Sequence, residues 1–224
     1  MVNPALLFVL FGILVSGGVI WSLYAASERR KELAAWAHSR GLAFNRAKDT
    51  TLDDRFPDFD CLRRGHSRYG HNLIRGRWSG REFLGFDYHY VTGSGKNRQT
   101  HNFSAVVLVS DVLLRPLFIR PEGFFDKVGE FFGLDDIDFE SAEFSREFYV
   151  KSADRRWAYD VIHARTMEFL LSAPKFHIEM DFQHVIAWRS STFEPVEFSA
   201  AADVISGLLN RLPEYVVRRQ KGVD

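Results

Sequence analysis

The chain has 224 residues and equal numbers of basic and acidic side chains, 29 of each, so its formal net charge is zero. This balance excludes the strong positive charge of a dedicated nucleic-acid-binding protein, and no nucleic-acid partner is expected. The 21 phenylalanines exclude a disordered main body. The single cysteine, Cys61, excludes an intramolecular disulfide and agrees with a reducing compartment.

The first predicted element is a transmembrane helix over residues 5–26, which would place the chain in a lipid bilayer. No charged residue interrupts this stretch, and about 22 residues at roughly 1.5 Å each match a hydrocarbon core of about 30 Å. Three basic residues follow it directly: Arg29, Arg30 and Lys31. Because no Lys or Arg precedes the stretch and positive flanks resist transfer, we expect a single-pass protein of the inner (cytoplasmic) membrane. Its N-terminus would lie outside and its soluble domain in the cytoplasm.

A cleaved signal peptide is the alternative to this anchor. Signal peptides carry a basic N-terminal region, an apolar core of about 7 to 15 residues and a cleavage site with small residues. The segment YAAS would allow cleavage, but the N-terminal flank is uncharged and the apolar core is longer. The sequence therefore favours an anchor.

Residues 27–41 are predicted to continue the helix out of the membrane, with Gly41 ending it. Residues 42–224 would then form one soluble domain. The part up to residue 60 is polar and irregular. Two extended runs, 72–78 and 82–91, flank Ser79-Gly80 and predict a β-hairpin.

The rest of the chain alternates between extended and helical patterns. We predict strands over 102–109 and 117–120, helices over 121–133 and 153–172, a hairpin of 176–180 and 184–188, and a helix over 194–212. Helices do not separate the strands regularly. The fold class is therefore α+β, with an antiparallel sheet and several helices after the transmembrane helix.

Two segments resemble those of a known family. GRWSGREFLGFDYHYVTGSGK and LFIRPEGFFDKVGEFFGLDDIDFESAEFSREFYVKSADRRWAYDV are similar to segments of a bacterial family whose members commonly combine an N-terminal membrane helix with a soluble domain. The similarity covers about residues 28–215, and RPEGFF…DDIDFE…FS is its most specific pattern. The resemblance implies this architecture. It implies no catalytic or binding residue, because the family has no established activity.

An acidic stretch, GLDDIDFESAEFSREF (133–148), has two interpretations. A calcium loop needs a glycine at its sixth position and a bidentate glutamate at its end. This stretch offers only alternating acids, with Phe139, Phe144 and Phe148 among them. A solvated turn between buried segments is therefore favoured over a metal site. We expect the aromatic rings to be buried and the carboxylates to face solvent.

Other candidate motifs are weak. GSGK (93–96) lacks the spacing and the following helix of a phosphate-binding loop, and is interpreted as a hairpin loop. His89 and His101 could face each other across a hairpin in a zinc site, although a surface or cross-strand pair without a metal is favoured. No GxSxG nucleophile motif occurs, and Cys61 lacks a catalytic signature. We predict no catalytic residue, cofactor or metal ligand.

The most unusual feature is the charge pattern of residues 63–81, which contain six arginines and no acid. Arg75 and Arg77 share one face of a strand because side chains repeat every two residues. With Arg29, Arg30 and Lys31, they are candidates to contact anionic headgroups or a protein partner. The alternative is that the arginines of 63–81 pair internally with the acids of 135–147.

These observations favour a non-enzymatic binding or interaction module on the cytoplasmic side of the membrane. The alternative is a membrane-tethered hydrolase whose site is assembled from distant segments. A deep pocket with converging polar groups would favour the hydrolase, whereas a shallow surface would favour the binding module.

Overall fold

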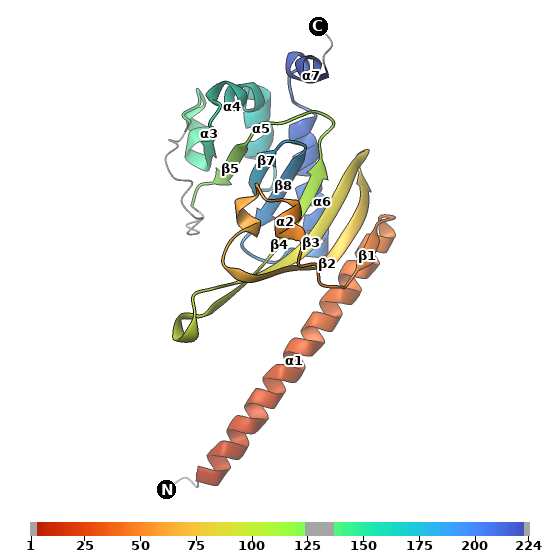
Figure 1. Ribbon diagram of the computed structural model, residues 1–224, viewed down its shortest axis with the longest axis vertical. Coiled ribbons are helices and arrows are strands. Elements are labelled where there is room, and N and C mark those ends of the chain that lie inside the picture. The colour runs from red at the N-terminus through yellow and green to blue at the C-terminus, as the bar shows by residue number, and fades with distance from the viewer. Residues whose placement is uncertain (1–3, 124–136, 222–224) are drawn as a thin grey trace.

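The computed structural model describes residues 4–123 and 137–221 as an α+β domain carried on a long N-terminal helix (Figure 1). The described helices are α1 (Pro4–Ser39), α2 (Leu52–Arg55), α3 (Ala142–Glu147), α4 (Arg155–Val161), α5 (Ala164–Ser172), α6 (Pro195–Leu209) and α7 (Glu214–Lys221). The strands are β1 (Ala43–Asn45), β2 (His66–Trp78), β3 (Arg81–Thr92), β4 (Gln99–Val109), β5 (Leu117–Pro121), β6 (Phe148–Lys151), β7 (His177–Asp181) and β8 (His184–Arg189). The predicted fold class is confirmed.

Helix α1 runs without a break from the apolar stretch into the domain. Its apolar half stands clear of the domain, whereas its second half lies on the sheet (Figure 1). Leu33 and Ala37 are fully buried there, and Trp36 stacks on Trp78 with 6.5 Å between ring centroids. In the described part of the chain, α1 is the one helix that is long and apolar enough to cross a membrane, by length and composition.

The predicted hairpin is confirmed as β2 and β3, and both strands are longer than expected. Ser79 and Gly80 have φ angles of 48° and 83°, which is the backbone of the tight turns that match strand twist. The β4, β5, β7 and β8 predictions are also confirmed, with small differences in their bounds.

All eight described strands form one antiparallel sheet in the order β1-β2-β3-β4-β8-β7-β5-β6. The chain therefore leaves the sheet after β4, forms one edge with β5 and β6, and returns with β7 and β8 to fill the gap. Each strand alternates its side chains between the two faces, so the sheet buries two separate apolar clusters.

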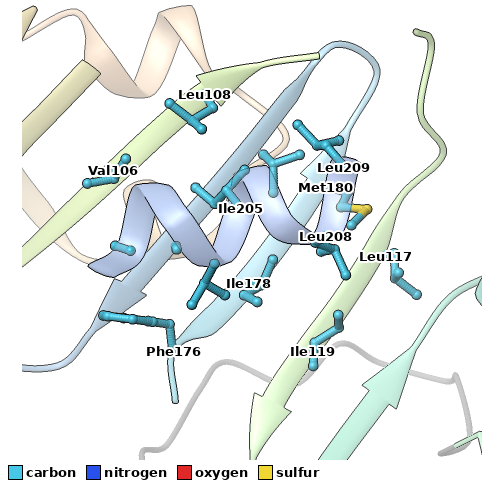
Figure 2. Close-up of a cluster of buried hydrophobic side chains, with 14 of the residues drawn as sticks. Val106, Leu108, Leu117, Ile119, Phe176, Ile178, Met180, Ile205, Leu208 and Leu209 are labelled. Carbon is cyan, nitrogen blue, oxygen red and sulfur yellow. The ribbon is translucent and has the colours of Figure 1, made fainter. Parts of the chain in front are cut away.

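The larger cluster lies between the sheet and helices α1, α4, α5 and α6. Helix α6 begins with a capping box made by Glu194 and Glu197 and with Pro195 at its first turn. Figure 2 shows its residues Ile205, Leu208 and Leu209 packed over β4, β5 and β7. The smaller cluster lies on the opposite face, where the segment that contains α2 covers β2, β3, β4 and β8.

The prediction of one helix over 153–172 is wrong, because the chain forms two helices. Ile162 leaves the helical conformation with ψ of 64°, and His163 follows with ψ of 173°. Ile162 is buried at this break, and the His163 ring lies 2.9 Å from the carbonyl oxygen of Arg211. These tertiary contacts outweigh a local helix preference that no Gly or Pro interrupts.

The acidic stretch is only partly described, because residues 124–136 lie outside the described ranges. These residues include the acids at 135 and 136 and most of the predicted helix over 121–133. Residues 137–148 of this stretch are described, and they do not form a simple turn. The prediction of a solvated turn is therefore wrong for this part. Ser141 caps α3 by accepting a hydrogen bond from the Phe144 amide, and β6 follows at once. Phe144 is fully buried and Glu143 is exposed, so the expected separation of rings and carboxylates is confirmed for this pair.

Candidate functional site

A crevice of about 350 Å³ opens on the sheet face opposite α6. It lies between residues 57–63 and the strands β5, β6 and β7, at the place where the segment containing α2 stops covering the sheet. Its charged lining combines four acidic and two basic side chains: Asp58, Asp60, Glu179, Asp181, Arg63 and Lys151. Polar groups from segments far apart in the sequence therefore converge on one cavity.

Glu179 is the most deeply buried of these carboxyl groups, with 4% of the residue exposed. It accepts hydrogen bonds from the Asp60 amide at 2.8 Å and from the Trp188 indole at 3.0 Å. Burial raises the pKa of Glu179 to about 7, and the nearby charge of Asp60 acts in the same direction. Glu179 can therefore take up and release a proton near neutral pH.

A second carboxyl pair lies at the other end of the crevice. Burial raises the pKa of Asp181 to about 6. The hydrogen bond that protonated Asp181 donates to Asp58 and the negative charge of Asp58 act in the same direction. A second negative charge close by favours the protonated form of Asp181. Burial raises the pKa of Asp60 as well, against the charges of Arg64 and Arg63. The crevice thus holds protons that solvated carboxyl groups would release.

The hydroxyl and thiol groups described around the crevice are not activated as nucleophiles. The Ser152 hydroxyl donates to the carbonyl oxygen of Pro116 at 2.7 Å. Cys61 is fully buried next to Glu179. Burial, the negative charge of Glu179 and a hydrogen bond to it raise the pKa of the Cys61 thiol well above its usual value, so the reactive thiolate is disfavoured. In the ranges that the structure describes, no group of three His, Cys, Asp or Glu residues is placed to hold a metal ion. The arrangement can exchange protons and bind polar or cationic groups.

Arg29, one of the predicted contact residues, points into the domain. Its guanidinium donates to both carboxylate oxygens of Asp87, at 2.9 and 2.7 Å, and to the carbonyl oxygen of Phe193 at 2.9 Å. Asp87 is fully buried and also accepts from Asn72 at 2.8 Å and Ser104 at 2.5 Å. We call Arg29 and Asp87 the clasp, because they join α1 to the sheet.

The clasp changes the acidity of Arg29. Burial opposes the charge on its guanidinium, but the hydrogen bonds and the charge of Asp87 outweigh burial and raise the pKa of Arg29. The next two predicted residues differ from it, since Arg30 and Lys31 are exposed. Lys31 lies 2.7 Å from Glu28 one turn earlier. The side chain of Arg29 therefore points into the domain, whereas those of Arg30 and Lys31 face solvent.

Arg75 and Arg77 lie on one face of β2, opposite Leu84 and Glu82 of β3. Arg75 is 3.4 Å from Asp49, and Arg77 donates to the carbonyl oxygen of Gly80. Both side chains are exposed. Arg75 and Arg77 lie near the C-terminal end of α1. The structure therefore does not bring them together with Arg30 and Lys31.

The alternative pairing with the acids of 135–147 is not seen within 137–147. The ion pairs recorded for the arginine-rich segment join Arg68 to Asp53, Arg75 to Asp49 and Arg81 to Asp111. These acids come from the segment before β2 and from the end of β4. Three of the six arginines thus form ion pairs within the described residues, but with acids outside the predicted segment.

The idea that His89 and His101 face each other is wrong. His89 is paired with Asn102 across β3 and β4, and His101 with Tyr90, so the two imidazoles point to opposite faces of the sheet. His89 lies 2.9 Å from the Asn102 side-chain oxygen, whereas His101 stacks on Tyr90 at 4.6 Å. A one-residue offset in register separates them.

Sequence reasoning missed Glu179 and the crevice. Asp60 and Glu179 are 119 residues apart, and nothing local connects them. One signal was available: β7 alternates His177, Glu179 and Asp181 with Ile178 and Met180, which predicts a strand with one polar and one apolar face. That polar face lines the crevice.

Together, the sheet, the covering helices and α1 define an α+β domain built onto a helix of membrane-spanning length. A solved structure with the same fold is that of the mycobacterial trehalose monomycolate transport factor A, TtfA, with a TM-score of 0.62 and 14% sequence identity. The similarity covers 82% of this chain and 96% of that chain. At this identity the likeness shows the fold. No protein-family model and no curated protein matches the sequence.

Proposed function

We propose that this protein is a membrane-anchored, non-enzymatic binding module that assists lipid transport from the cytoplasmic side of the inner membrane. The observation that carries the proposal is the continuity of α1. Its apolar half is exposed, and its second half is part of the domain core through Leu33, Ala37 and the clasp. A domain held in this way keeps a fixed orientation beside the bilayer, as an accessory to a membrane machine requires.

The comparison supports the choice of lipid transport, since a protein with a similar fold is a transport factor for trehalose monomycolate. The crevice supports binding over catalysis, because its described hydroxyl and thiol groups are not activated. Its size suits a small polar group or a partner side chain.

Affinity purification of the full chain from detergent-solubilised native membranes tests this proposal. We expect an integral-membrane lipid transporter to be recovered in a constant ratio. Depletion of the protein should make one envelope lipid accumulate on the cytoplasmic side. Recovery of the chain without a transporter, together with unchanged lipid distribution, would contradict the proposal.

A tethered hydrolase is the second candidate, and Glu179 is the observation in its favour. A carboxyl group with a pKa of about 7 in a crevice is suited to general acid–base catalysis. This candidate requires that the purified full chain hydrolyses an ester or phosphoester substrate and that the Glu179→Gln variant loses this activity. The same preparation with no turnover would favour the binding module.

The proposed orientation is tested with reporter fusions after Asp224. Because Arg30 and Lys31 follow the apolar stretch and no basic residue precedes it, the C-terminus should stay in the cytoplasm. Alkaline phosphatase fused there should be inactive, and a green fluorescent reporter should fold and fluoresce. High phosphatase activity would place the domain outside and would revive the signal-peptide interpretation.

A further inference from the structure

We infer that the tip of the β3–β4 hairpin, residues 93–98, is a second membrane contact that rests on anionic lipid headgroups beside α1. This inference rests on the proposed anchoring of α1 in a bilayer. It assigns a lipid-binding role to a loop that lies far from the arginine-rich end of the hairpin β2–β3.

Two contacts fix α1 and β3 relative to each other. Trp36 stacks on Trp78, which directly precedes the turn into β3, and Arg29 is bound to Asp87 in the middle of that strand. Passing from Trp36 to Arg29 along α1 therefore corresponds to passing from the start of β3 towards its end. The two elements continue in the same general direction, and Figure 1 shows the hairpin leaving the domain on the side of the apolar half of α1.

Element lengths then bring the hairpin tip to the membrane. From Arg29 to the end of the apolar stretch at Ala26 is about 5 Å along a helix. From Asp87 to Gly93 is about 20 Å along a strand. The hairpin tip therefore reaches at least as far as the boundary of the apolar stretch, where a bilayer presents its headgroups. A polar loop is excluded from the hydrocarbon layer, so it must lie on the headgroups.

The chemistry of the hairpin tip suits an anionic surface. Lys96 and Arg98 are exposed, and neither has an ion-pair partner among the described residues. No acidic residue lies between Asp87 and Asp111 in the sequence. The two strands and their loop thus carry positive charge without local compensation, which attracts phosphate-bearing lipids.

The hairpin tip is also a folded turn. Gly93 has a φ of 67°, and a Cβ atom there would lie 2.3 Å from the carbonyl oxygen of Asn97. The Asn97 amide donates to the Ser94 carbonyl oxygen at 3.1 Å. The turn thus holds Lys96 and Arg98 together at the end of the hairpin, where both can meet the same surface.

Amphipathic side chains continue this surface towards α1. The ammonium group of Lys48 lies 4.0 Å from the ring centroid of Tyr69, which stacks on His89 at 4.6 Å. His89 is two residues beyond Asp87 towards the hairpin tip. Tyr rings with a cation beside them are typical of the headgroup layer.

Arg75 and Arg77 are at the other end of the hairpin β2–β3, next to Trp78. That end is level with the C-terminal part of α1, about 20 Å of helix beyond the apolar stretch. A helix that spans the bilayer would hold these two arginines away from it. The geometry therefore favours Lys96 and Arg98 over Arg75 and Arg77 as headgroup contacts.

Site-directed fluorescence in vesicles tests the inference on the full chain. A fluorophore at Asn97→Cys reports on the hairpin tip, and one at Asp111→Cys reports on the opposite end of β4 as a matched control. Cys61 is fully buried and leaves labelling to the introduced thiol. With a nitroxide on the lipid headgroups of phosphatidylglycerol–phosphatidylcholine vesicles, we expect strong quenching at Asn97→Cys and little at Asp111→Cys.

Charge dependence separates a headgroup contact from simple proximity. Adding Lys96→Gln and Arg98→Gln should lower the surface-bound population of the tip by about 30-fold, since each charge contributes about fivefold. For the unmodified loop, replacing the mixed vesicles with vesicles of phosphatidylcholine alone should lower the surface-bound population of the tip to the same extent. Equal quenching at the two reporter positions, or quenching unchanged by the charge variants, would overturn the inference.

A separate measurement distinguishes failure of the anchor from failure of this contact. Alkaline extraction removes proteins that do not span the bilayer. If extraction releases the chain, the proposed anchoring is wrong. If the chain is retained and the Asn97→Cys label is unquenched, the anchoring stands and the hairpin contact is wrong.

Discussion

Replacing Arg29 with methionine is expected to lower the free energy of unfolding of the full chain by about 3 to 5 kcal/mol. The change leaves the Asp87 carboxylate fully buried without Arg29, the one cation that the described residues place in an ion pair with it, and an uncompensated buried charge has a cost of this size. Asn72 and Ser104 still donate to the carboxylate, but neutral donors do not replace the charge. Urea unfolding in detergent micelles measures the difference.

Arg30→Met is the matched control, because Arg30 is the next residue on the same helix and is exposed. Its effect should stay within about 0.5 kcal/mol. The double variant Arg29→Met with Asp87→Asn should be more stable than the sum of the two single changes predicts, since it removes the buried charge with its partner. A loss below about 1 kcal/mol in Arg29→Met would show that the clasp does not hold α1 to the sheet.

Glu179 should make the domain less stable as pH rises from about 5 to about 8. The folded-state pKa of Glu179 is about 7, raised from 4.5. Between these values the folded chain keeps a proton that the unfolded chain has lost, so the free energy of unfolding falls with rising pH and levels off above pH 7. The shift corresponds to about 3 kcal/mol.

Glu179→Gln isolates this effect because glutamine keeps the shape and cannot titrate. Relative to the parent protein, its free energy of unfolding should rise by about 3 kcal/mol between about pH 5 and about pH 8. Glu168→Gln, at an exposed position, should follow the parent at every pH. Asp181, with a pKa of about 6, contributes in the same direction in both proteins, and it therefore cancels in the comparison. A difference between Glu179→Gln and the parent that is flat across the whole pH range would contradict the assignment to Glu179.

Local features of the fold were predictable from sequence. The hairpin β2–β3 follows from alternating side chains around Ser79-Gly80, and a membrane-spanning length follows from an uncharged apolar stretch. Both signals lie within a few residues of the structure that they specify. The sheet order was not predictable, since β8 pairs with β4 across about 80 residues and alternation does not identify a partner.

The candidate site was beyond prediction for the same reason. Glu179 meets Asp60 only because η1 (Asp60–Leu62) folds over β7. Arg29 was singled out by its place after the apolar stretch, and its partner Asp87 is 58 residues away. Charge next to a membrane helix predicts topology. It does not reveal that one of three neighbouring cations turns inward.

The clasp also bears on how the protein is made. Arg29 leaves the ribosome early, and the carbonyl group of Phe193 that it binds follows 164 residues later, which is roughly ten to thirty seconds of synthesis. The apolar half of α1 can enter the bilayer during that interval, so the sheet would assemble on a helix already held there. In a chain that is not inserted, the sheet would have to pack against Leu33 and Ala37 of a helix that is not in a membrane. The apolar half of that helix would then be exposed to aggregation or to binding by chaperones.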